Sequence, residues 1–348
     1  MIPFTKWVRR DGLTQRMSEA ERAIASVLAQ AAATEGLLHA AASFGPMGVD
    51  LRCDHVGFVT SVQRAAVAES SLSKWPSLRV FMLTEKSLSF EALPTPLQPH
   101  STKAAVRVIN TPRYTCLVNQ HLLWVADRES ATILRWSRSE GSVPEWESVR
   151  PLRFALNWWA AENGSALLHA GVVAYEGKAV VLAGKGGTGK STTVCACLDS
   201  QLSVLADDYC LVEPATSDSD ATVHALFGVG HVNTRSIELL PSLRSRVIHD
   251  DPETKSLVRL IDHAPSPARI TAIATITRRP GADTQIRTTS RSDVLRLAAP
   301  STIAQSDGAH EHIWRVLTRV VQTSRAWDLQ VGSLPDVPGA ILEALQNS

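Results

Sequence analysis

The sequence predicts an α/β protein in two parts: a smaller α+β domain over residues 1–150 and a larger α/β domain over residues 151–348. The length of 348 residues is the first observation, because domains of roughly 100–200 residues make two domains the natural expectation. The second is a change of pattern near residue 150. Apolar strand-like runs alternate with helical ones after it, whereas the pattern before it is irregular.

Composition excludes several classes of protein. Apolar residues make up 44% of the chain and charged residues 20%, which is ordinary for a globular protein with a buried core. The net charge of +1, from 35 basic and 34 acidic side chains, gives no indication of nucleic acid or an anionic membrane as partner. No apolar run approaches the roughly 20 residues of a membrane span, and the N-terminus has no secretory stretch. We therefore expect a cytoplasmic protein.

The cysteines support the same location. There are five, an odd number, and no two of them form a Cys-x-x-Cys pair. This pattern argues against a disulfide framework and against a structural zinc site. We expect buried, reduced thiols.

The first 150 residues predict few regular elements. Residues 18–21, Ser-Glu-Ala-Glu, have capping-box spacing, so a helix is expected over the alanine-rich stretch 22–42. Strands are expected at 78–83, 104–109, 122–126 and 132–136, with Pro94, Pro96 and Pro99 in a loop. Cys53, Asp54 and His55 are adjacent, but neighbours in an extended chain point to opposite faces, so we interpret them as structural. Position alone suggests an accessory domain for substrate docking.

The second part predicts a more regular alternation. A buried helix is expected over 152–162, followed by two strands, 171–175 and 178–183, joined by a Glu-Gly turn. A helix from Gly189 to about Asp199 and a strand over 202–206 come next. Later elements are a strand over 270–276 and helices over 310–324 and 338–345.

A phosphate-binding motif lies between the second of those strands and the following helix. Residues 184–191, Gly-Lys-Gly-Gly-Thr-Gly-Lys-Ser, fit G-x-x-x-x-G-K-[ST], in the strand-to-helix context that the motif requires. Glycines let several main-chain N–H groups converge on a phosphate. We expect Lys190 to neutralise the β- and γ-phosphates and Ser191 to ligate Mg²⁺. The predicted nucleotide-binding residues are Gly184, Lys185, Gly186, Gly187, Thr188, Gly189, Lys190, Ser191 and Thr192.

Two aspartates and a histidine accompany this motif. Asp207 and Asp208 follow the strand after the P-loop helix, where carboxylates come close to the metal and the phosphates. One carboxylate suffices to bind Mg²⁺, so the second is free to accept a proton from an incoming hydroxyl. His169 precedes the strands that lead to the P-loop, and both a structural and a functional role are open for it.

Together, His169, the P-loop and the Asp207-Asp208 pair resemble HPr kinase/phosphorylase. The resemblance is closer to the HPr-kinase-like proteins of peptide natural-product clusters, such as the lasso-peptide precursor kinases, within the phosphoenolpyruvate-carboxykinase-like P-loop fold. It covers about residues 150–348. It implies a kinase that uses ATP and Mg²⁺ to phosphorylate serine on a peptide or protein, with Asp207 as general base, Asp208 near the metal and His169 near the transferred phosphate.

The sequence also departs from that family. The glycine-rich stretch with a glutamate that follows the second aspartate in HPr kinase has no clear equivalent in residues 231–238. The resemblance therefore leaves open both HPr as substrate and a reverse phosphorylase reaction. Arg235 and Lys255, on later loops, are candidates for phosphate contacts or for simple surface solvation.

Other functions remain open. Lys185 also satisfies the deviant Walker A pattern of chromosome-partitioning ATPases, although about 180 residues precede the motif here and the aspartates come early. A kinase of a small hydroxylated metabolite would share the same core. A non-catalytic nucleotide-binding regulator is disfavoured by the intact Lys190, Ser191, Asp207 and Asp208. The sequence is compatible with a homo-oligomer.

Overall fold

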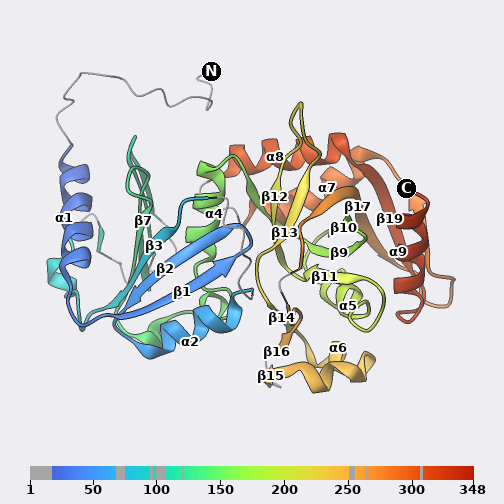
Figure 1. The fold of residues 1–348 in the computed structure, drawn as a ribbon, viewed down its shortest axis with the longest axis horizontal. Helices are drawn as coiled ribbons and strands as arrows, with labels where there is room; N and C mark the ends of the chain where they lie inside the picture. Colours follow the sequence, from blue (N-terminus) through green and yellow to red (C-terminus); the bar gives the residue numbers. More distant parts are fainter. Residues whose placement is uncertain are drawn as a thin grey trace.

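The computed structural model describes residues 18–67, 75–94, 97–98, 107–119, 121–250, 255–263, 265–305 and 309–348. Two large mixed sheets lie side by side, with helix α4 (Arg153–Glu162) between them (Figure 1). The predicted α/β class is therefore confirmed. Among the described residues, no helix is both long enough and apolar enough to cross a membrane.

The first sheet has seven strands in the order β1-β2-β3-β7-β6-β5-β4. Strands β2, β3 and β7 are parallel to one another, and the other neighbours are antiparallel. The bounds are β1 Leu38–Phe44, β2 Met47–Cys53, β3 Leu78–Thr84, β4 Arg107–Asn110, β5 Tyr114–Val118, β6 Leu122–Asp127 and β7 Thr132–Ser137. The predicted strands at 78–83, 122–126 and 132–136 are confirmed, whereas 104–106, Pro96 and Pro99 lie outside the described residues.

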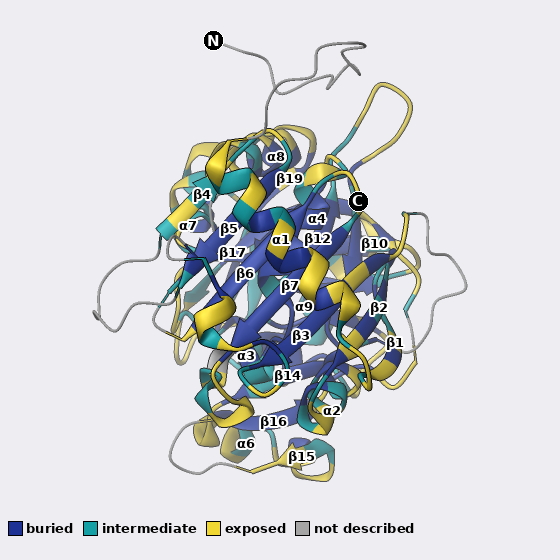
Figure 2. Cartoon of the chain, turned by 90° about the vertical axis from the view of Figure 1, so that its left-hand side faces the viewer, coloured by how far each residue is buried: buried dark blue, intermediate teal, exposed yellow. Residues whose placement is uncertain are grey.

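Helices cover both faces of this sheet. Helix α1 (Glu19–Ala33) packs on one face, and Figure 2 shows the buried strands behind it. Helix α2 (Val56–Ala65) and α4 pack on the other. The predicted capping box at Ser18 is confirmed, but the helix does not continue to residue 42. The helix ends at Ala33, where Thr34 adopts an extended conformation, and the alanine-rich residues that follow Gly36 pair with β2 instead. Tertiary pairing here overrides helix propensity.

The second sheet has nine strands. Its bounds are β8 Ala166–His169, β9 Gly171–Tyr175, β10 Lys178–Ala183, β11 Ser203–Ala206, β12 Tyr209–Glu213, β13 Thr222–Ala225, β17 Ala268–Arg278, β18 Gln285–Thr288 and β19 Arg325–Val331. The order is β11-β9-β10-β17-β13-β12-β8, and β19 pairs with β17 and β18. Strands β10, β17 and β19 run parallel, so their carboxyl ends lie at one edge.

Several helices surround this second sheet. They are α5 Lys190–Cys195, α6 Thr234–Leu239, α7 Arg291–Ile303, α8 His310–Thr323 and α9 Val337–Gln346, whereas α3 Glu145–Val149 contacts α2. A three-stranded sheet, β14 Val229–Val232, β15 Val247–His249 and β16 Ser256–Arg259, lies beside α6. The helix expected from Gly189 to about Asp199 is shorter than predicted, because regular helix ends at Cys195 and turns follow.

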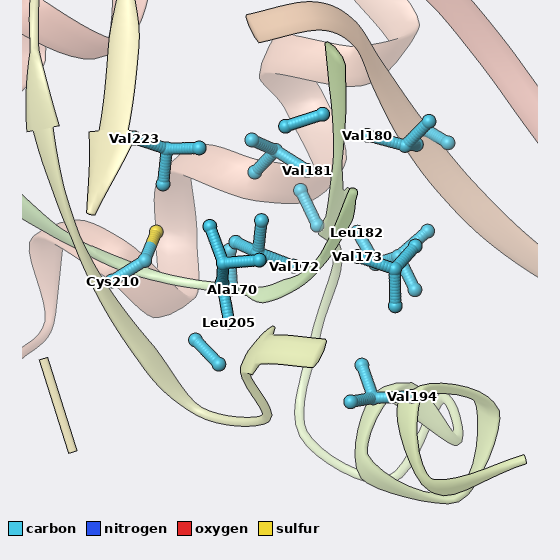
Figure 3. Close-up of a cluster of buried hydrophobic side chains, with 14 of the residues drawn as sticks. Ala170, Val172, Val173, Val180, Val181, Leu182, Val194, Leu205, Cys210 and Val223 are labelled. Carbon is cyan, nitrogen blue, oxygen red and sulfur yellow. The ribbon is translucent and has the colours of Figure 1, made fainter. Parts of the chain in front are cut away.

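The hydrophobic core of this half is built around β9 and β10. Val194 of α5 points at the side chains of these strands, including Val173 and Leu182 (Figure 3). Gly171 makes this approach possible, because a Cβ there would lie 2.5 Å from Val194 Cγ2. The fold thus seats the helix that follows the P-loop directly on the sheet.

The two sheets share a core. Apolar residues of α4 pack with the seven-stranded sheet and also with Leu167, Leu211 and Phe227 from the second half of the chain. All five cysteines are buried and free, as predicted. Cys53, Asp54 and His55 are structural, as predicted: Asp54 accepts hydrogen bonds from Thr84, and His55 caps α2.

Candidate active site

The loop with the predicted phosphate-binding motif follows the carboxyl end of β10. Gly187 and Gly189 have φ values of +80° and +99°, a region that side chains rarely adopt, so the turn requires glycine. Within the described part of the chain, the N–H groups of Gly186, Gly187, Gly189, Lys190 and Ser191 donate to no main-chain carbonyl. The loop therefore presents a set of unused donors, which suits an anion.

Lys190 lies folded back into this loop. Its side chain is buried, and Nζ donates to the carbonyl oxygens of Gly184 at 2.8 Å and Lys185 at 3.2 Å. Burial lowers the pKa of Lys190, while the charges of Asp208 and Asp207 oppose that shift. The P-loop lysine and both aspartates therefore belong to one electrostatic site.

Strand pairing brings His169 to Asp208. Strand β12 is antiparallel to β8, with Tyr209 opposite His169, so Asp208 arrives beside the histidine. His169 Nε2 lies 2.7 Å from Asp208 Oδ1, and the imidazole packs at 5.5 Å from the Tyr209 ring. Gln305 Nε2 is 3.4 Å from His169 Nδ1. The contact of His169 with Asp208 thus follows from local strand register, while its predicted place near the transferred phosphate stays a prediction.

Asp207 is held inside the protein by Arg150. The two side chains are 3% and 4% exposed, and Arg150 Nη2 donates to Asp207 Oδ1 at 3.0 Å. The His231 main-chain N–H donates to the other oxygen at 3.2 Å. Burial raises the pKa of Asp207, and the Arg150 charge opposes that rise.

Asp208 has the opposite electrostatic character. Burial would raise its pKa, but the His169 hydrogen bond and the Arg150 and Lys190 charges lower it to about 2. Arg150 Nε lies 3.8 Å from Asp208 Oδ2, so one guanidinium serves both aspartates. The two neighbouring carboxylates therefore differ in pKa, which is raised for Asp207 and lowered for Asp208, because their surroundings differ.

A cavity of about 310 Å³ opens beside this cluster. Asp208 borders it and Asp207 does not. The remaining lining residues are Val149, Arg150, Arg153, Tyr209, His231 and Gln305. Arg153 is anchored there by a 2.7 Å hydrogen bond to the Gln305 carbonyl. The cavity is therefore of mixed polarity and is bordered by Asp208, the partner of His169.

Sequence reasoning missed two basic residues. Arg150 is an isolated arginine in the sequence, and nothing local marks it as functional. Arg278 is the last residue of β17, the parallel neighbour of β10. Ala183 of β10 pairs with Thr275 of β17. A Cβ on Gly189 would lie 2.9 Å from Arg278 Nη2, so this guanidinium covers the P-loop. The signal that could have identified Arg278 is its position as a basic residue at the end of the strand next to the P-loop strand.

The other predicted residues are placed as follows. Thr192 Oγ1 lies 2.7 Å from the Ser236 hydroxyl, which joins the P-loop helix to α6. Arg235 is exposed on α6, and its phosphate contact stays a prediction. The charge of Lys255 lowers the pKa values of Lys190 and His231, so Lys255 lies near the site. Among the described residues, no group of three or more His, Cys, Asp or Glu side chains could hold a metal by itself.

Comparisons with known proteins cover this same region. A family model described as SynChlorMet cassette protein ScmC matches residues 146–229, which include Arg150, His169, the P-loop and both aspartates. No curated protein matches the sequence. Among solved structures, the HPr(Ser) kinase/phosphatase from Coxiella burnetii is 11% identical, with a TM-score of 0.27, over 52% of this chain and 94% of that one.

Proposed function

We propose that this protein is an ATP- and Mg²⁺-dependent kinase that phosphorylates a hydroxyl group, the serine of a peptide or protein. One observation carries the proposal: the P-loop, its lysine and the acidic cluster with its cavity occupy one end of the same sheet. Phosphoryl transfer depends mainly on positioning and charge neutralisation, and these groups provide both.

The hydrogen-bond donors of the loop suit a triphosphate. The unused N–H groups after β10 supply hydrogen bonds, and Lys190 supplies charge once it exchanges its two carbonyl acceptors for phosphate oxygens. Arg278 adds a second cation over the same loop. Bidentate donors of this kind suit phosphate oxygens.

The Ser191 hydroxyl and the Asp208 carboxylate would hold Mg²⁺. Both are oxygen donors, the type that Mg²⁺ prefers, and it keeps waters and substrate phosphates as its other ligands. With a pKa of about 2, Asp208 is ionised at neutral pH and borders the cavity. When bound, Mg²⁺ neutralises charge that develops on the phosphates.

Asp207 is the proposed proton acceptor. The acceptor oxygen attacks the γ-phosphorus in line, a new O–P bond forms, the bond to the β–γ bridging oxygen breaks, and ADP leaves with that electron pair. The hydroxyl proton passes to Asp207, whose pKa is raised by burial while Arg150 keeps its carboxylate oriented. His169 keeps Asp208 in place through their 2.7 Å contact.

The acceptor would enter through the cavity beside Asp208, and a shift of Arg150, which lines that cavity and covers Asp207, would bring its hydroxyl to Asp207. Its volume of about 310 Å³ admits a serine side chain with its main chain, and Arg153 and Gln305 offer polar contacts. The same volume also suits a small hydroxylated metabolite, which is the second candidate acceptor.

The test is mass spectrometry of acceptors incubated with the full chain, ATP and Mg²⁺. Serine-containing peptides and small alcohols are offered in parallel, with Lys190→Ala as the inactive control. Gain of one phosphate by a peptide supports the proposal, and gain by an alcohol alone moves the assignment to a metabolite kinase. ATP hydrolysis by a nucleotide-dependent dimer, with no phosphorylated acceptor, overturns the kinase proposal in favour of a switching ATPase.

A further inference from the structure

Basic residues begin three adjacent strands at the edge of the sheet opposite the P-loop. Strand β10 begins with Lys178, and Arg269 of β17 is its register partner. Strand β19 begins with Arg325, opposite Ala272 of β17. Since these strands are parallel, their amino ends share one edge, while the P-loop follows the carboxyl end of β10. The six residues of β10 separate the two edges by about 20 Å.

Arg269, Arg325 and a third arginine line one cavity at this edge. Arg291, the first residue of α7, joins them around a space of about 210 Å³. An adjoining cavity of about 630 Å³ shares Arg291 and Arg325 and extends along β18 and β19. Segments far apart in sequence therefore bring three guanidinium groups to one place.

The acidic groups at this cavity are Asp220 and the carboxylate of Ser348, the last residue of the printed sequence. Asp220 Oδ2 lies 3.7 Å from Arg269 Nε, but this carboxylate is 72% exposed. Arg291 Nη2 makes only a 3.5 Å bond to the Ser324 carbonyl, and neither Arg291 nor Arg325 has an ion pair within the described residues. Positive charges gathered in this way repel one another unless an anion joins them.

Two buried hydroxyls point to the same conclusion. Ser324 and Thr271 line the smaller cavity and are 3% and 7% exposed. Neither Oγ of Ser324 nor Oγ1 of Thr271 has a hydrogen-bond partner within the described residues. Buried polar atoms without partners are rare in proteins, so each needs an acceptor or a water. The Lys178 ammonium does not enter this cavity, because its Nζ donates to the main-chain oxygens of Leu345 and Ser348.

We propose that this cavity, the amino-edge site, binds a phosphate group, either free phosphate or the phosphate of a small metabolite. Arginine side chains provide charged, fork-shaped donors that match phosphate oxygens. The site is separate from the P-loop and does not depend on the proposed kinase activity.

The test is calorimetric titration of the full chain with inorganic phosphate at constant ionic strength. Lys190→Ala is the background, because it weakens phosphate binding at the P-loop. Adding Arg291→Ala and Arg325→Ala should weaken the remaining binding at least about tenfold, since each removes charged hydrogen bonds. The matched control adds Arg315→Ala and Arg319→Ala, two exposed arginines of α8, and removes the same net charge.

The outcomes separate clearly once thermal unfolding has shown that each variant is folded. Equal phosphate affinity in the Arg291/Arg325 and Arg315/Arg319 variants overturns the proposal, as does absence of binding in the Lys190→Ala background. Glycerol 3-phosphate then distinguishes the sources. Tighter binding than inorganic phosphate identifies a metabolite-borne group, and equal or weaker binding identifies free phosphate. Phosphoryl transfer does not enter any readout, so failure of the kinase proposal leaves this result interpretable.

Discussion

The Arg150 guanidinium lies 3.0 Å from the Asp207 carboxylate, and both side chains are almost fully buried. This buried ion pair ties the segment between the two sheets to the strand end that carries the acidic pair. Removal of one partner leaves the other charge buried without compensation, which is more costly than absence of both.

Arg150→Met should therefore lower the free energy of unfolding by about 3–5 kcal/mol, measured by chemical denaturation. The double variant Arg150→Met/Asp207→Asn should recover part of that loss, because the unpaired charge is gone. A single variant within about 0.5 kcal/mol of the wild type would show that the ion pair does not hold this junction together.

Gly171→Ala should displace α5, the helix that follows the P-loop. The new Cβ would lie 2.5 Å from Val194 Cγ2, so α5 must shift, at a cost of about 1–3 kcal/mol and with weaker nucleotide binding. Val194→Ala in the same chain should restore much of both. Gly339→Ala is the control, since its Cβ meets nothing within 4 Å. Equal stability of the Gly171 and Gly339 variants would refute the steric explanation.

Arg278→Ala should weaken ATP binding at least about tenfold, because charged hydrogen bonds to the phosphates are lost. Arg279→Ala is the neighbouring control and should leave affinity unchanged. Calorimetric titration with the Mg²⁺–ATP complex measures both. If the two variants bind ATP alike, Arg278 is a surface residue and not part of the nucleotide site.

Acid should destabilise the first sheet through Asp127. Burial would raise its pKa, but bidentate hydrogen bonds from Arg113, at 2.8 and 2.9 Å, and one from Ser130 lower the pKa below its usual value. A carboxyl with a lower pKa in the folded state stabilises above the unfolded-state pKa, and this stability is lost as pH falls through the folded-state pKa. Asp127→Asn should be less stable by about 2 kcal/mol at pH 7, with a smaller difference at pH 3. A pH-independent difference would contradict this.

The sequence predicted the local parts of the candidate site and not its tertiary contacts. The P-loop and the Asp207-Asp208 pair are contiguous motifs, so their residue types and spacing were sufficient. Arg150 and Arg278 act through strand order and burial, which no short window of sequence contains. His169 lies between these cases: its position was predicted, but its contact with Asp208 depends on the pairing of β8 with β12.

The fold shows the same division. Long β-branched or apolar strands such as β10 and β17 were predicted, since their pattern alone identifies them. Strand β1 was predicted as helix, because alanines favour helix and only pairing with β2 decides otherwise. Short strands such as β13 and β14, with four residues each, carry too little pattern to be found.

The most direct test of the kinase account is one variant measured two ways. Asp207→Asn keeps the shape of the side chain but removes its charge and basicity. Once an acceptor is identified, ATP affinity should stay within about threefold of the wild type, while the rate of phosphoryl transfer falls by about 10²–10⁴-fold. Transfer at the wild-type rate with intact nucleotide binding would contradict the assignment of Asp207 as proton acceptor.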